Sequence, residues 1–252
     1  MPHPLVLAAG SMLDCGASTI VGAAAAAGFD GVGLRLSGEH AVTEPDALRR
    51  WAEGVGVSIH YTEVYRVGAA AVDPVPLIEV SAAVGATALL VVSDVPDRAT
   101  TLRRVAELTE LCRARGLELG LEYMAWTDPA SPLDAIDVAR ATGCRLVVDV
   151  LHHTRVGAGV EELDAIVSSG TLGWVQLCDA LLAPPEDGDL LHEARHGRLA
   201  PGEGELPLRA LLARVPDDVV VSVEVQSDAL ATVGLVERAR LLHDAARRVL
   251  GG

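Results

Sequence analysis

The chain has 252 residues, a formal net charge of −15 at pH 7 and a composition in which 50% of the residues are hydrophobic. Its lysine and arginine total of 20 is all arginine, which excludes Schiff-base aldolases, covalently held pyridoxal phosphate and Walker A phosphate loops, because each needs a lysine amine. The acidic balance argues against nucleic acid or membrane partners, and no apolar run reaches the ~18 residues of a membrane span.

Short apolar runs alternate with longer stretches of helical periodicity along the chain, as in the amphipathic stretch 97–115. Several helical stretches end at a glycine, which tolerates a left-handed cap: Gly28, Gly56, Gly85, Gly116 and Gly143. We expect eight strands, at residues 5–8, 31–36, 57–61, 88–92, 117–122, 145–150, 172–177 and 219–225.

Eight strand–helix units without a break in composition predict a single (β/α)₈ TIM barrel of the α/β class over residues 1–252. A doubly wound open sheet is the competing architecture. The longest irregular segment, 180–206, follows the seventh strand, and we expect it to be an active-site loop.

The first residues lack the basic and extended apolar regions of a signal peptide. The four cysteines lie far apart without a CxxC pair, which argues against a disulfide framework or a zinc knuckle. We therefore expect a cytoplasmic protein with reduced thiols. The oligomeric state stays open, and a homo-oligomer is one possibility.

Polar side chains stand near the carboxyl ends of the last four expected strands: Glu122, Asp149, Gln176 and Glu224. In a barrel these positions face one cavity, where several unpaired carboxylates would be costly. A divalent cation would remove that cost. The alternative is that each acid caps a helix or pairs with an arginine.

On these residues the chain resembles the xylose isomerase-like TIM barrel superfamily, the sugar phosphate isomerases and epimerases. The likeness covers essentially the whole chain, and its motifs are the segments 25–32, 149–152, 176–179 and 201–204 together with Glu122 and Glu224. The resemblance implies that Glu122, Asp149, Gln176 and Glu224 bind one divalent metal, that His152 lies beside it, and that Arg198 reaches the substrate.

The sequence departs from the superfamily at Gln176, where a histidine is usual. An amide coordinates through its oxygen, so the four donors become hard and favour Mn²⁺ or Mg²⁺ over Zn²⁺. The same substitution resembles that of some dehydroshikimate dehydratases. The acidic surface and the missing histidine argue against the superfamily's endonuclease branch.

Other polar and aromatic residues have two interpretations each. We expect His152 to take a catalytic or substrate role. His60 and Glu63, near the third strand, are candidates for binding a substrate hydroxyl, although Glu63 pairing with Arg66 is the simpler interpretation. Trp126 is a candidate wall of the pocket or a packing residue.

The leading hypothesis is a metal-dependent isomerase or epimerase of a small polyhydroxylated ketone or keto acid. Glu122 and Glu224 would act as base and acid on opposite faces of one carbon, through an enediolate. The first alternative is a lyase of the dehydroshikimate or inosose dehydratase type, in which His152 helps a hydroxyl to leave. The second is a non-catalytic barrel that binds a ligand.

Overall fold

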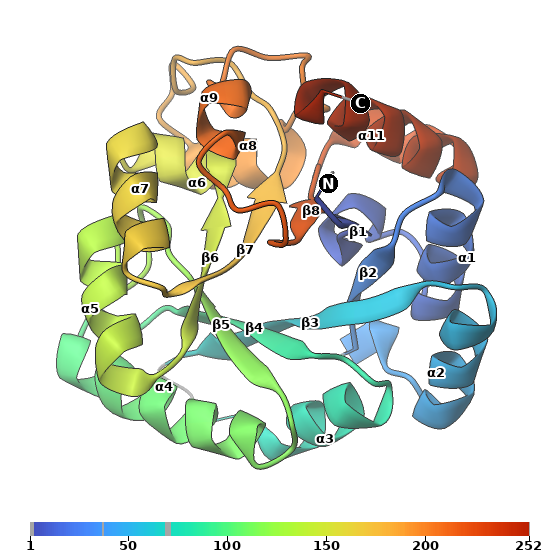
Figure 1. Ribbon diagram of the computed structural model, residues 1–252, viewed down its shortest axis with the longest axis horizontal. Helices are drawn as coiled ribbons and strands as arrows, with labels where there is room; N and C mark the ends of the chain where they lie inside the picture. The colour runs from blue at the N-terminus through green and yellow to red at the C-terminus, as the bar shows by residue number, and fades with distance from the viewer. Residues whose placement is uncertain (1–2, 37, 69–71, 252) are drawn as a thin grey trace.

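The computed structural model describes residues 3–36, 38–68 and 72–251. Each strand pairs in parallel with the next, and the last pairs with the first, so the sheet closes into the expected (β/α)₈ barrel (Figure 1). The open-sheet alternative is thereby wrong. The strands are β1 (Leu5–Leu7), β2 (Gly31–Arg35), β3 (Ser58–Val67), β4 (Ala88–Ser93), β5 (Glu118–Glu122), β6 (Arg145–Asp149), β7 (Leu172–Leu177) and β8 (Val221–Val223).

Helices form an outer layer around the barrel, and the last long helix closes the ring against the first (Figure 1). The α-helices are α1 (Ala17–Ala27), α2 (Pro45–Gly54), α3 (Val75–Ala83), α4 (Arg98–Arg113), α5 (Pro132–Thr142), α6 (Val150–Arg155), α7 (Val160–Ser168), α8 (Leu190–His196), α9 (Leu208–Leu212), α10 (Asp228–Ala231) and α11 (Leu235–Leu250). Two short 3₁₀ helices are η1 (Ala9–Met12) and η2 (Gly38–His40).

Each expected strand overlaps an observed one, and β3 differs most in extent. It continues to Val67, whereas the apolar run ends at Tyr61. The extension contains Glu63 and Arg66, which interrupt the apolar pattern while the backbone goes on pairing with β4. All five glycines expected to end helices have positive φ; Gly28, at 88°, donates its amide to Ala24 and Ala25.

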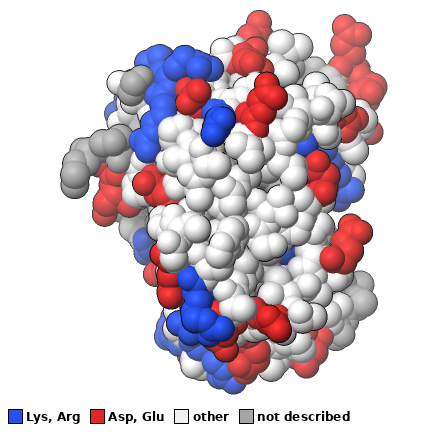
Figure 2. All heavy atoms as spheres, turned by 90° about the vertical axis from the view of Figure 1, so that its right-hand side faces the viewer, with Lys and Arg blue, Asp and Glu red and all other residues white. Residues whose placement is uncertain are grey.

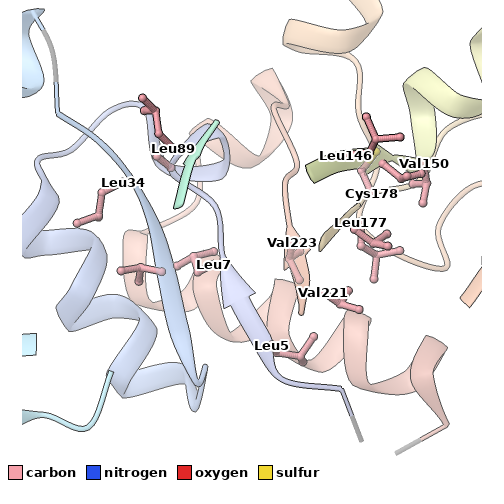
Figure 3. Packing of buried hydrophobic residues seen from close by; sticks show 14 of the residues in the cluster. Leu5, Leu7, Leu34, Leu89, Leu146, Val150, Leu177, Cys178, Val221 and Val223 are labelled. Carbon is pink, nitrogen blue, oxygen red and sulfur yellow. The ribbon is translucent and has the colours of Figure 1, made fainter. Parts of the chain in front are cut away.

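The period of two along the strands divides the core into two layers. Outward residues such as Leu5, Leu7, Val221 and Val223 pack beneath the helices (Figure 3). A smaller cluster fills the barrel interior, with Val6, Ala8, Tyr61, Ala88, Leu90, Val92, Met124, Val147 and Trp174 as its buried members.

Two stacked aromatic rings pack inside the barrel. Tyr61 of β3 and Trp174 of β7 have ring centroids 5.1 Å apart. A Cβ at Gly33 would lie 2.3 Å from the Tyr61 ring, and a Cβ at Gly120 would lie 2.2 Å from the Trp174 ring. Glycine on β2 and β5 therefore makes room for the two buried aromatic side chains of this layer.

No helix in the described ranges is long and apolar enough to cross a membrane. Figure 2 shows the face on the side of α1, α2 and α11, where the middle is largely uncharged and arginines lie in separate groups near the edges. That face carries no continuous basic surface of the kind that binds nucleic acid.

Candidate active site

Strand alternation brings the four expected ligands to one end of the barrel interior. Val147 and Trp174 face inward, so Asp149 and Gln176, two residues further along β6 and β7, do the same and pair in register. Glu122 ends β5, and Glu224 follows β8. All four are buried, with exposed fractions of 1 to 6%. The carboxyl ends of these strands thus form a buried acidic centre of Glu122, Asp149, Gln176 and Glu224.

Arg198 is the cation inside the acidic centre. Its Nη1 donates to Asp149 Oδ2 at 2.6 Å and to the Glu224 carbonyl at 3.1 Å, and lies 3.6 Å from Glu224 Oε2. Its Nη2 lies 3.3 Å from His152 Nε2. Arg198 is 2% exposed and also lines the cavity, so it lies where a substrate would reach it.

Two oxygens in the acidic centre lack a hydrogen-bond partner in the described part of the chain: Glu122 Oε1 and Gln176 Oε1. The Gln176 amide donates through Nε2 to Glu224 Oε2 at 2.7 Å, which leaves its oxygen available as a donor to a cation. Three carboxylates here face one guanidinium, an excess of two negative charges. Buried, unpartnered oxygens and this excess fit a divalent cation.

His152 gives a second possible ligand set. Glu122, Asp149 and His152 offer ligand atoms that all lie within 4.8 Å of one another. Asp149 caps α6 by accepting from the amides of Leu151 and His152 at 2.9 and 3.0 Å, which fixes the histidine beside the acidic centre. Asp149 therefore does cap a helix and pair with an arginine, as the simpler interpretation expected, but Glu122 does neither within the described residues.

Burial and neighbouring charges shift the pKa values of the three carboxylates in different directions. Burial raises the pKa of Glu122 well above its usual value, and the charges of Asp149 and Glu224 raise it further. Burial also raises the pKa of Glu224. Burial acts in the same direction on Asp149, but the charges of Arg198 and His152 and the hydrogen bonds that Asp149 accepts from them together outweigh it and lower that pKa. Burial lowers the pKa of His152 to about 4.

Three residues of the acidic centre, Glu122, Gln176 and Glu224, line a cavity of about 340 Å³, a size that suits a small molecule. Trp126 lines the cavity and meets the His152 ring edge to face at a centroid distance of 5.2 Å. Glu63 lines it too. His60 does not lie among the residues that line the cavity. Because β3 extends beyond the apolar run, His60 lies near the start of the strand, where its ring packs against Tyr61 and Trp174.

Glu63 pairs with Arg35, not with Arg66. Arg35 Nη2 donates to Glu63 Oε1 at 3.3 Å, whereas Arg66 Nη1 donates to both carboxylate oxygens of Asp94. Arg35 was missed by sequence reasoning. Its signal is its position, since it ends β2 two residues after the inward-facing Gly33. Burial raises the pKa of Glu63 to about 7, and the charge of Glu224 adds to the effect.

The segment 180–206 supplies residues to the cavity, Arg198 among them. It is not irregular throughout, because Asp189 caps α8 within it. Asp179 accepts from the amides of Gly202 and Leu206, and a Cβ at Gly204 would lie 2.5 Å from Asp179 Oδ1. Arg155 anchors the segment from α6 through Glu193. These contacts position Arg198.

Gly10 provides the space that Glu224 occupies. A Cβ at Gly10 would lie 2.2 Å from Glu224 Oε1, so Gly10→Ala must displace that carboxylate. We expect the variant to fold and to lose about tenfold or more in Mn²⁺ affinity, a loss typical of disturbed metal-site geometry. Calorimetric titration measures it. Gly16→Ala, whose Cβ meets nothing within 4 Å, is the control, and equal affinity in both variants would contradict the prediction.

Fold and site together define a (β/α)₈ barrel with an acidic centre at the carboxyl ends of its strands. The chain belongs to the xylose isomerase-like TIM barrel family, whose model matches residues 21–248. This confirms the family that the sequence motifs indicated. A search of curated proteins found no match.

Solved structures of the same fold are similar over nearly all of this chain. A xylose isomerase-like TIM barrel/4-hydroxyphenylpyruvate dioxygenase fusion protein is 20% identical with a TM-score of 0.82; the match covers 98% of this chain but 42% of that one. The IOLI protein with a bound zinc atom is 16% identical over 98% of each chain, with a TM-score of 0.81. An L-ribulose 3-epimerase is 15% identical over 99% and 95%, with a TM-score of 0.72.

Proposed function

We propose that this protein is a divalent-metal-dependent isomerase or epimerase of a small polyhydroxylated ketone or keto acid. The observation that carries the proposal is a pair of buried glutamates, Glu122 and Glu224, that reach one cavity from strands three positions apart around the barrel. The zinc-bearing IOLI protein and the L-ribulose 3-epimerase, which share the fold, support a reaction of this class.

Glu122, Asp149, Gln176 and Glu224 would hold the cation, and their oxygen donors favour Mn²⁺ or Mg²⁺ over Zn²⁺. A cation of this kind, when bound, acidifies the C–H bond next to a carbonyl group. His152 would remain beside the acidic centre and contact a substrate hydroxyl. Trp126 would exclude water from one side of the substrate.

Glu122 and Glu224 would move the proton. One carboxylate removes it from the carbon next to the carbonyl, and the other returns a proton to the opposite face, which inverts the configuration there. Arg198 would keep Glu224 oriented through the contact with its carbonyl.

A dehydratase is the second candidate, and the cavity-lining Arg35 favours it, since a carboxylated substrate would suit that guanidinium. Both reactions begin with removal of the same proton. They differ in whether the carbon is reprotonated or a hydroxyl β to the carbonyl leaves as water.

The experiment is a screen of ketoses, inososes, hydroxylated keto acids and dehydroshikimate in deuterated water. An epimerase returns a product of unchanged heavy-atom composition with deuterium at the inverted carbon, which is the expected result by mass spectrometry and NMR. Loss of water, with new ultraviolet absorbance and no deuterated epimer, would establish the dehydratase instead. A protein that holds no metal and turns over nothing would support the non-catalytic barrel.

For the cellular location we propose the cytoplasm. All four cysteines, Cys15, Cys112, Cys144 and Cys178, are free thiols, and three of them are buried. Free thiols are typical of proteins in a reducing compartment.

A further inference from the structure

A second polar group faces the cavity across from the acidic centre. Arg35, the last residue of β2, pairs in register with Glu63 in the middle of β3, and both line the cavity. In the closed strand order, β2 and β3 lie opposite β6 and β7, which carry Asp149 and Gln176. A molecule that filled the cavity would therefore contact both groups at once.

Both members of this pair have unused hydrogen-bonding atoms. Arg35 Nε and Glu63 Oε2 are buried and have no partner in the described ranges of the chain. The one hydrogen bond between them, at 3.3 Å, uses a single N–H of the guanidinium. An arginine carries five N–H donors, and buried polar atoms are rarely left without partners. Glu63 is only 2% exposed, so solvent does not satisfy its second oxygen.

The charges of the buried groups do not oppose an anion once a divalent cation is bound. Glu63, Glu122, Asp149 and Glu224 are buried, and Arg35 and Arg198 face them, so a divalent cation brings their formal charges to zero. Arg195 also lines the cavity but is exposed to solvent, and Arg66 is paired with Asp94.

We infer that Arg35 and Glu63 form a subsite for a carboxylate with a hydroxyl group on a nearby carbon, so that the substrate is a hydroxylated carboxylic acid and not a neutral sugar. The carboxylate accepts from Arg35 Nε, and the hydroxyl donates to Glu63 Oε2. The charge balance rests on the proposed function, whereas the unused atoms of Arg35 and Glu63 do not.

The test measures binding by calorimetry with matched pairs of ligands: gluconate with glucitol, and quinate and shikimate with their methyl esters. We expect at least one acid to bind about tenfold or more tightly than its neutral partner, as charge-assisted hydrogen bonds predict. The double variant Arg35→Gln/Glu63→Gln should lose this preference. It removes both charges together, so no buried carboxylate is left unpaired.

Arg66→Gln is the matched control, because Arg66 lines the same cavity but is paired with Asp94, and it should keep the preference. Three results would overturn the inference: no acid binds, the neutral partners bind equally well, or a folded double variant keeps the preference. Circular dichroism tests whether the double variant is folded. If the double variant is unfolded, the single variant Arg35→Lys takes its place, because lysine keeps the positive charge but has no Nε–H donor of the guanidinium kind.

Titrations with Mn²⁺ and in chelator separate this inference from the proposed function. An acid preference that depends on Arg35 in a protein that binds no metal would refute the proposed function alone. A metal-bound protein that epimerises neutral ketoses without any acid preference would refute the subsite alone.

Discussion

Glu224→Gln is expected to lower turnover by about 10³-fold, within the range found for general acid–base groups. The amide has nearly the same shape, but it cannot accept or return a proton. The measurement is the rate of hydrogen exchange or product formation with the substrate that the screen in deuterated water identifies. The variant and the wild-type protein should have similar melting temperatures. The amide keeps the shape of the side chain, and the substitution removes one buried negative charge from a centre that has an excess of negative charge.

Glu203→Gln is the control for this prediction, since Glu203 is exposed on the segment that carries Arg198. It should keep wild-type turnover. If the Glu224 variant retained more than about a tenth of the activity, proton transfer by Glu224 would be refuted, because loss of such a group costs at least ~10²-fold.

Gln176→His is expected to reverse the metal preference. The wild-type protein should bind about one divalent ion per chain and prefer Mn²⁺ over Zn²⁺, because every donor of the proposed set is an oxygen. An imidazole nitrogen at position 176 is a softer donor and raises the affinity for Zn²⁺ most. Elemental analysis after competitive loading with both metals measures the change.

Gln226→His is the matched control, because Gln226 lines the same cavity and contacts Glu224 Oε1 at 3.3 Å but is not one of the proposed ligands. It should leave the metal preference unchanged. An unchanged preference in the Gln176 variant would mean that Gln176 is not a ligand, and zinc preference in the wild type would refute the argument from hard donors.

The barrel and its acidic centre were predictable because both depend on local order in the sequence. Alternation along β6 and β7 fixes that Asp149 and Gln176 face inward, whatever surrounds them. Parallel strands in chain order then bring their carboxyl ends together. The burial of the four residues follows from these two rules.

The partners of individual side chains were not predictable, since they depend on distances across the barrel. Arg66 lies three residues from Glu63, yet Arg35 pairs with Glu63 because adjacent strands place the two residues side by side. Arg198 likewise reaches Asp149 across 49 positions of sequence. The apolar run predicts that the strand ends at Tyr61, but β3 continues to Val67. His60 therefore lies near the start of the strand and not at the expected site.

The stacked rings of Tyr61 and Trp174 also limit which residues the neighbouring strands can carry. A Cβ at Gly33 or Gly120 would lie 2.3 or 2.2 Å from a ring atom, so an alanine at either position must displace a ring. We expect each such variant to lose about 1–3 kcal/mol of stability, as overpacked cores do. Thermal denaturation measures the loss, and Gly16→Ala, whose Cβ meets nothing within 4 Å, should show none.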